Sequence, residues 1–103
     1  MRVYVAGPMT GIDALNFPAF HAEAARLRAL GHDAVNPAEI NPDEAMSWQQ
    51  CMRADIAALV TCDAVSLLPG WEKSKGATLE HHTAEWLGME IACAPAVPET
   101  AKG

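Results

Sequence analysis

Residues 2–8 read RVYVAGP, and this stretch decides the fold class of the chain. The run RVYVA is rich in β-branched and aromatic side chains and predicts a short buried strand. The Gly7-Pro8 pair ends the run and predicts a loop over residues 7–15. Helix-type sequence follows at once, so the chain opens as an α/β fold does, with a strand and then its crossover helix.

Helical and strand-like segments alternate along the rest of the chain. Helices are predicted from Asn16 to Leu30, from Ser47 to about Val60 and from about Ala77 to Leu87, and further strands at residues 32–36, 63–68 and 90–93. Two prolines in residues 37–46 predict a loop there. Regular alternation implies right-handed βαβ crossovers, and therefore a parallel sheet of four to five strands covered by helices.

Polar side chains stand where the helices should begin. Asn16 can cap the first helix, and Ser47 followed by Gln50 matches the capping box that opens a helix. Ser74 can cap the helix that carries Glu80, while Gly76 lets a ligand approach the first backbone N–H groups of that helix closely. Capping and contact with a phosphate are compatible roles for Ser74.

Length and composition indicate one compact domain. The chain has 103 residues, half of them hydrophobic, which is enough for a single core. We expect residues 1–94 to form the domain and residues 95–103 to form a flexible tail. The formal net charge of −6 opposes binding to polymeric nucleic acid, but not to a small nucleotide held by backbone N–H groups. No apolar run approaches the roughly 18 residues of a membrane span, so we expect no membrane partner.

The cysteines and histidines follow no metal-binding or redox pattern. Cys51, Cys62 and Cys93 are odd in number and far apart, which favours a reducing, cytoplasmic compartment and a role for all three as core filler. His81 and His82 are adjacent, and neighbours in a helix point to different faces. We therefore predict no metal site and no cofactor.

Two acidic residues lie on predicted helix faces that are otherwise apolar. Glu80 shares a face with Ala77, Ala84 and Leu87, about one turn from the helix start. Asp55 lies on or at the edge of an apolar stripe in the preceding helix. Ligands of parallel sheets bind beyond the carboxyl ends of the strands, where both carboxylates would converge. Such a pair suggests glycosidic chemistry. The alternatives are a solvated Glu80 and a boundary Asp55 paired with a nearby cation.

The sequence allows two alternative roles for each of two aromatic residues. Tyr4 is central in the first strand and is either a core residue with a satisfied hydroxyl group or part of the pocket wall. Trp71 lies in the loop of residues 69–76 and could stack on a base. A role for Trp71 as a lid or a dimer contact is an equal alternative.

The motifs together resemble those of the nucleoside 2-deoxyribosyltransferase superfamily. They are VYVAGPM at residues 3–9, Asp55, CDAV at residues 62–65, and Ser74-x-Gly76-x-x-x-Glu80. The opening AGPMTG, Asn36-Pro37 and the LPGWE of residues 68–72 look most like one branch of it, the domain of unknown function 4406. The resemblance covers residues 2 to about 93 and implies a flavodoxin/Rossmann-like three-layer sandwich.

The resemblance also implies an activity, namely hydrolysis or transfer at the N-glycosidic bond of 2′-deoxynucleosides or their 5′-monophosphates. Glu80 matches the nucleophile of the family, Asp55 the acid that orients the sugar or handles the proton, and Tyr4 the tyrosine beside them. Ser74 matches a phosphate-binding serine of the monophosphate hydrolases. The other matches are the loop at the sugar and phosphate, formed by Gly7, Pro8, Met9 and Thr10, although hydrolases often place a basic residue at position 10.

The resemblance implies a homodimer or a higher homo-oligomer whose partner molecule is a small nucleoside or nucleotide. Two alternatives to an enzyme stay open. The same pocket could recognise a nucleotide without turning it over, as an accessory module does. The chain could also be a small dimerising domain whose pocket takes no ligand.

Overall fold

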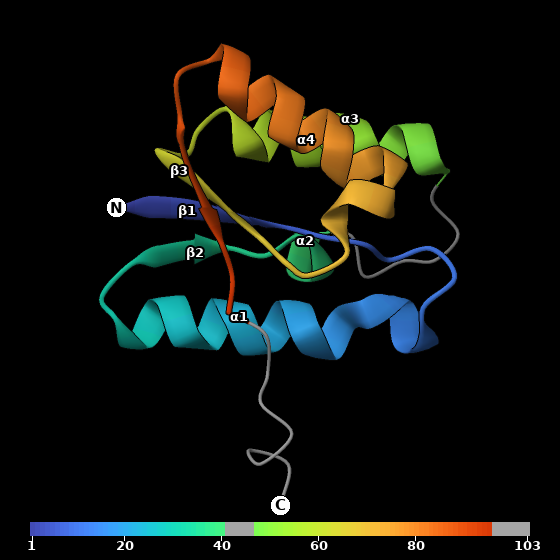
Figure 1. Ribbon diagram of the computed structural model, residues 1–103, viewed down its shortest axis with the longest axis horizontal. Helices are drawn as coiled ribbons and strands as arrows, with labels where there is room; N and C mark the ends of the chain where they lie inside the picture. The colour runs from blue at the N-terminus through green and yellow to red at the C-terminus, as the bar shows by residue number, and fades with distance from the viewer. Residues whose placement is uncertain (41–46, 96–103) are drawn as a thin grey trace, which may run out of the picture.

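The computed structural model describes residues 1–40 and 47–95, and within them the strands form one parallel sheet in the order β2-β1-β3-β4 (Figure 1). The strands are β1 (Arg2–Ala6), β2 (Asp33–Val35), β3 (Ala64–Leu67) and β4 (Glu90–Cys93). The predicted α/β fold with a parallel sheet is confirmed. The tail predicted to be flexible lies, apart from Pro95, outside the described residues.

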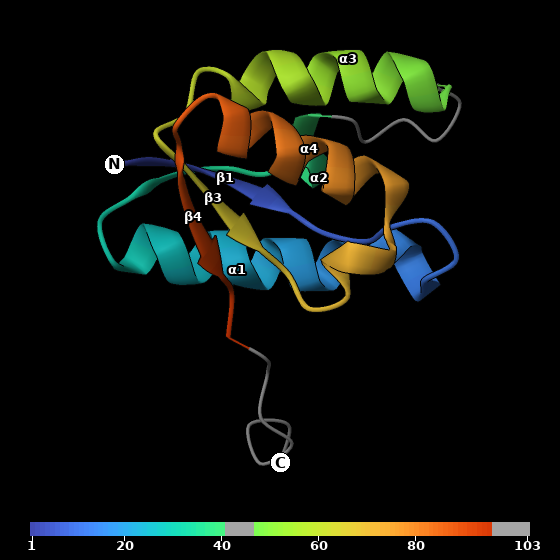
Figure 2. The same cartoon turned by 45° about the horizontal axis from the view of Figure 1, so that its top comes forward.

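Helices cover both faces of the sheet (Figure 2). They are α1 (Phe17–Ala29), α2 (Pro37–Ile40), α3 (Trp48–Leu59) and α4 (Lys75–Trp86), with short 3-10 helices η1 (Asp13–Asn16) and η2 (Trp71–Lys73). The helix α1 lies on one face, and α3 and α4 lie on the other. This arrangement is the three-layer sandwich that the resemblance implies. The connection from β1 to β2 runs across the sheet in the opposite direction from the two later connections, so right-handed crossovers place α1 on one face and α3 and α4 on the other.

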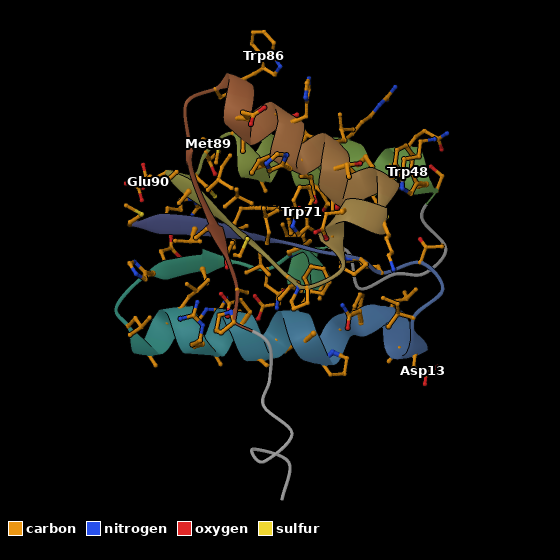
Figure 3. The ribbon with its side chains drawn as sticks, in the orientation of Figure 1. Asp13, Trp48, Trp71, Trp86, Met89 and Glu90 are labelled. Carbon is orange, nitrogen blue, oxygen red and sulfur yellow. The ribbon has the colours of Figure 1, made fainter. Side chains whose placement is uncertain are left out.

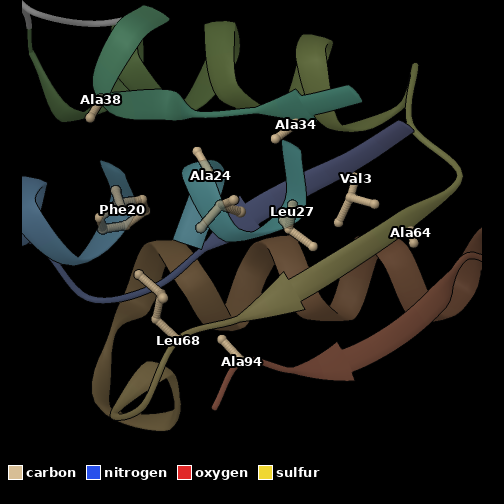
Figure 4. Close-up of a cluster of buried hydrophobic side chains, with 10 residues drawn as sticks. Val3, Phe20, Ala24, Leu27, Ala34, Ala38, Ala64, Leu68 and Ala94 are labelled. Carbon is tan, nitrogen blue, oxygen red and sulfur yellow. The ribbon is translucent and has the colours of Figure 1, made fainter. Parts of the chain in front are cut away.

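Each face of the sheet has its own apolar core. Beneath α1 lie Val3, Phe20 and Leu27 with several buried alanines (Figure 4). Beneath α3 and α4 lie Tyr4 and Val65 with the other members of that cluster, which are Ala6, Leu59, Cys62, Leu67 and Ala84. Alternate residues of the central strand β1 point to opposite faces, so Tyr4 faces α3 and α4 while its neighbours face α1.

The start of α1 differs from the prediction. Asn16 does not cap the helix through its side chain: its φ is 60°, and its Nδ2 donates to the carbonyl oxygen of Pro8 at 3.0 Å. The preceding 3-10 turn, in which Ala14 and Leu15 also have positive φ, turns Asn16 back toward the loop after β1. Asn16 therefore fastens that loop instead of the helix end.

A short helix forms where the sequence predicts a loop. Residues Pro37–Ile40 are helical, because Asn36 Oδ1 accepts a hydrogen bond from the backbone N–H of Ala38 at 3.0 Å and proline fits the first turn of a helix. Asn36 is buried and also contacts the His21 ring. The rest of the predicted loop, residues 41–46, lies outside the described residues.

The other helix starts follow the sequence closely. Ser47 and Gln50 form the predicted capping box of α3. Ser74 Oγ accepts from the backbone N–H of Ala77 at 3.2 Å, so α4 begins at Lys75, two residues earlier than predicted. A capping side chain acts one residue before the first helical position, which is why its position predicts the boundary better than hydrophobic spacing does.

Some predictions of burial are wrong. Leu87, placed by its spacing on the buried face of α4, is exposed because the helix ends at Trp86. Of the three cysteines, Cys62 is buried, Cys51 is half-buried and Cys93 is exposed on the edge strand β4, so only Cys62 fills the core. Within the described residues, none of the three forms a disulfide bond.

Candidate active site

A cavity of about 1150 Å³ lies at the carboxyl edge of the sheet. The loops that follow β1 and β3 form part of its wall, as the topology predicts, and the N-terminal halves of α3 and α4 form most of the remainder. Its volume is ample for a nucleotide-sized ligand. Among the described residues, the polar and charged side chains that line it are Thr10, Gln49, Asp55, Lys73, Ser74, Lys75 and Glu80.

Glu80 is a buried acid in the wall of this cavity. It lies on the inner face of α4 between Ala77 and Ala84, which are both buried, and its own exposed fraction is 4%. The Tyr4 hydroxyl group donates to Glu80 Oε2 at 2.5 Å. The solvated alternative for Glu80 is therefore wrong in this structure.

The protonation of Glu80 is unusual for a carboxylic acid. Burial is the main cause that raises the pKa of Glu80 to about 8, and the negative charge of Asp55 raises it further. The hydrogen bond from Tyr4 lowers this pKa by less than burial raises it. Glu23, another buried acid, shows the opposite behaviour. Burial raises its pKa, but hydrogen bonds from Arg26 and Ser66 outweigh this and lower it. No positive charge is among the influences that shift the pKa of Glu80 within the described residues.

Asp55 lies on the facing helix and lines the same cavity. It is 7% exposed, on the buried side of α3 with Met52 and Leu59. Its negative charge raises the pKa values of both Glu80 and Tyr4, so Asp55 is electrostatically coupled to both groups. The structure thus brings together the two acids that the sequence could only place on separate helices.

Tyr4 lies behind Glu80 and is not among the described residues that line the cavity. Its side chain is fully buried. Burial, followed by the negative charges of Glu80 and Asp55, raises the pKa of Tyr4 well above its ordinary value. The phenol therefore stays neutral and acts as a hydrogen-bond donor to Glu80.

The two glycine-containing loops approach the cavity closely. Residues 7–10 and Ser74, Lys75 and Gly76 all line it. A Cβ at Gly7 would lie 2.7 Å from Leu68 Cβ, so only glycine lets the exit of β1 pass the end of β3. Ser74 Oγ caps α4 at the cavity wall. Lys75 and Gly76, which carry the first backbone N–H groups of the helix, line the same cavity.

Trp71 is the one proposed substrate-binding residue that the described part of the cavity wall does not include. It packs against the core cluster of Tyr4, and its ring lies 4.5 Å from the His81 ring, centroid to centroid, at an interplanar angle of 35°. Contacts with α4, through His81, and with the core cluster that contains Tyr4 hold the indole ring of Trp71. The sequence did not point to Trp48, which does line the cavity.

Comparisons with known proteins identify the family and the fold of the chain. The chain matches the family described as Domain of unknown function (DUF4406) over residues 1–93, and it belongs to that family. A solved structure of a 2-deoxyribosyltransferase from the psychrotolerant bacterium Bacillus psychrosaccharolyticus is similar, with a TM-score of 0.70 and 18% identity. The match covers 98% of this chain and 80% of that chain. The predicted resemblance is confirmed for the family and the fold. No curated protein matches the chain.

Two negative findings concern residues 1–40 and 47–95 alone. Within these ranges, every helix is too short or too polar to cross a bilayer. The same ranges hold no group of three or more His, Cys, Asp or Glu side chains arranged to bind a metal ion.

Proposed function

We propose that this protein cleaves or exchanges the N-glycosidic bond of 2′-deoxynucleosides or their 5′-monophosphates. The observation that carries the proposal is the contact between Tyr4 and Glu80 at a cavity that Asp55 shares. Buried, coupled acids are uncommon unless chemistry needs them, since their ionisation opposes folding. The fold shared with a 2-deoxyribosyltransferase supports the same chemistry.

In the proposed reaction, the ionised form of Glu80 attacks C1′ of the sugar. The C1′–N bond breaks, the base leaves with the bonding electron pair, and a proton relayed by Asp55 or supplied by water neutralises it. Water or a second base then attacks C1′ and releases Glu80. Tyr4 holds one carboxylate oxygen of Glu80, which leaves the other oxygen for the sugar.

The cavity wall supports separate places for the sugar and its 5′-substituent. Gly7, Pro8, Met9 and Thr10 are proposed to contact the sugar, and Ser74 and Gly76 to contact a 5′-phosphate. Thr10 supplies no positive charge, but Lys73 and Lys75 line the same cavity. Their ammonium groups offer the charge-assisted contacts that a phosphate requires.

A second candidate, a binding module without turnover, rests on the protonation of Glu80. With a pKa of about 8, most Glu80 side chains carry a proton at neutral pH, and a neutral carboxylic acid is a poor nucleophile. If a bound ligand does not lower this pKa, the pocket recognises a nucleotide and leaves it intact. The two candidates differ in whether the free base is released.

The test is release of free base from 2′-deoxynucleosides and their 5′-monophosphates, followed by chromatography. We expect release by the wild type, and a loss of at least about a hundredfold in Glu80→Gln with the fold retained. Glu85→Gln, on the exposed side of the same helix, is the control and should match the wild type. Unchanged release by Glu80→Gln would falsify the enzyme proposal. Saturable binding without release would select the binding module.

A further inference from the structure

The mouth of the cavity carries an indole ring that the proposed reaction does not use. Trp48 is the first residue of α3 (Figure 3). It lines the cavity, and 40% of its surface is exposed. An indole ring stabilises a folded protein most when it is buried. The exposed part of a ring in a cavity wall is therefore apolar surface that is available to contact a ligand.

The surrounding contacts hold this ring in place. The capping box of Ser47 and Gln50 fixes the first turn of α3, to which Trp48 belongs. At Gly76 an added Cβ would lie 3.1 Å from Met52 Sδ and 3.8 Å from Trp48 Nε1. The missing side chain of Gly76 therefore lets α3 and α4 approach each other beside the ring, and the indole forms a preorganised wall.

The neighbourhood of Trp48 divides the cavity by chemistry. Along α3, Met52 and Asp55 follow Trp48 at one and two turns, so that all three line the cavity from one side. The end of η2 and the start of α4 contribute Lys73, Ser74 and Lys75, which are polar or positively charged. A planar apolar group fits the α3 side, and an anionic group fits the α4 side.

We propose that Trp48 is the platform on which the base of the nucleotide stacks, an inference that rests on the proposed function of the same cavity. Every nucleobase has a flat π-face, and stacking on an aromatic side chain is largely independent of base identity. The Lys75 ammonium lies over the Trp48 ring, 4.8 Å from its centroid, and therefore covers one face of the ring. The base would stack on the opposite face or displace the ammonium. Trp48, and not Trp71, then determines affinity for the base.

The test is binding, measured by calorimetry in the Glu80→Gln background so that no turnover is needed. The probes are 2′-deoxyadenosine 5′-monophosphate and 2-deoxyribose 5-phosphate, which lacks the base. We expect Trp48→Ala to weaken binding of the nucleotide about tenfold or more and to leave binding of the sugar phosphate within about twofold. Trp48→Phe should restore most of the lost affinity, because it keeps an aromatic face.

The control is Leu30→Ala, because Leu30 is 63% exposed at the end of α1 and does not line the cavity. It should bind both probes as its parent does. Equal nucleotide affinity with and without the Trp48 ring, an equal loss for both probes, or no binding of the nucleotide to Glu80→Gln overturns the platform. Base release by the wild type is judged separately, so the reaction can stand when the platform fails, and the platform can stand when no base is released.

Discussion

The Tyr4 hydroxyl group donates to Glu80 Oε2 at 2.5 Å, across 76 positions of sequence. This contact joins the central strand of the sheet to the helix that carries the proposed nucleophile. Since Asp55 raises the pKa values of both partners, the strand and the two helices each contribute one group to an electrostatically coupled cluster.

Replacing Tyr4 by phenylalanine should slow base release and shift its pH dependence. The hydrogen bond from Tyr4 lowers the pKa of Glu80, so its loss raises that pKa above about 8 and reduces the ionised fraction at neutral pH. Loss of a hydrogen bond to a charged group corresponds to about a 10- to 100-fold decrease in kcat/KM. The measurement is the pH profile of kcat/KM, whose rising limb should move to higher pH. An unmoved limb would contradict the proposed role of Tyr4.

The stability of the wild type should fall between about pH 4.5 and pH 8. Glu80 has a raised pKa in the folded state, so in this range the folded chain holds a proton that the unfolded chain has released. Linkage then lowers the free energy of unfolding by up to about 1.4 kcal/mol per pH unit, and the slope from this group ends above pH 8. Urea titrations of wild type and Glu80→Gln should diverge over this window. If the free energies of unfolding of the two proteins change in parallel with pH, the pKa of Glu80 is not raised in the folded state.

Substitutions of Ser74 should separate its capping role from a role at a phosphate. Ser74→Ala loses the side-chain acceptor of the Ala77 N–H, which costs about 1 kcal/mol of stability. Ser74→Asp keeps a good cap but adds a negative charge at the cavity. We expect it to reduce kcat/KM for the 5′-monophosphate far more than for the free nucleoside. An equal reduction for both substrates would place the phosphate elsewhere.

The two cavity glycines should respond differently to alanine. At Gly7 the new Cβ meets Leu68 Cβ at 2.7 Å, and this atom is tied to the backbone, so we expect a loss of about 1–3 kcal/mol. At Gly76 the nearest atom is Met52 Sδ at 3.1 Å, on a flexible side chain. Alanine also favours the helix there, so the net change should stay within about 1 kcal/mol. Chemical denaturation of both variants measures the two losses of stability. A loss in Gly76→Ala as large as that in Gly7→Ala would contradict this prediction.

The chain should form a homodimer, as the resemblance implies. Leu79, Trp86 and Leu87 are exposed apolar side chains of α4 and its end, and such surface commonly marks a protein contact. Light scattering at micromolar concentration should give twice the chain mass for the wild type and for Glu85→Gln. Trp86→Lys should shift the population toward the monomer. A strictly monomeric wild type would remove this prediction.

Several features of this protein were determined by the sequence itself. The run RVYVAGP defines the first strand and its loop, and the side chains of Ser47, Gln50 and Ser74 define where α3 and α4 begin. These features rest on hydrophobic periodicity and on hydrogen bonds between residues at most three positions apart, so neighbours in the chain are sufficient to specify them. The alternation of such segments then leads to the parallel sheet.

Only the tertiary structure decided which side chains share the cavity. Spacing placed Glu80 and Asp55 near apolar faces, but their burial depends on how the two helices rotate against the sheet, and that rotation follows from contacts between distant residues. The same packing turned Asn16 back toward the loop after β1 and held Trp71 against His81. It also brought Trp48 to the cavity, because Gly76 on another helix leaves space beside its ring.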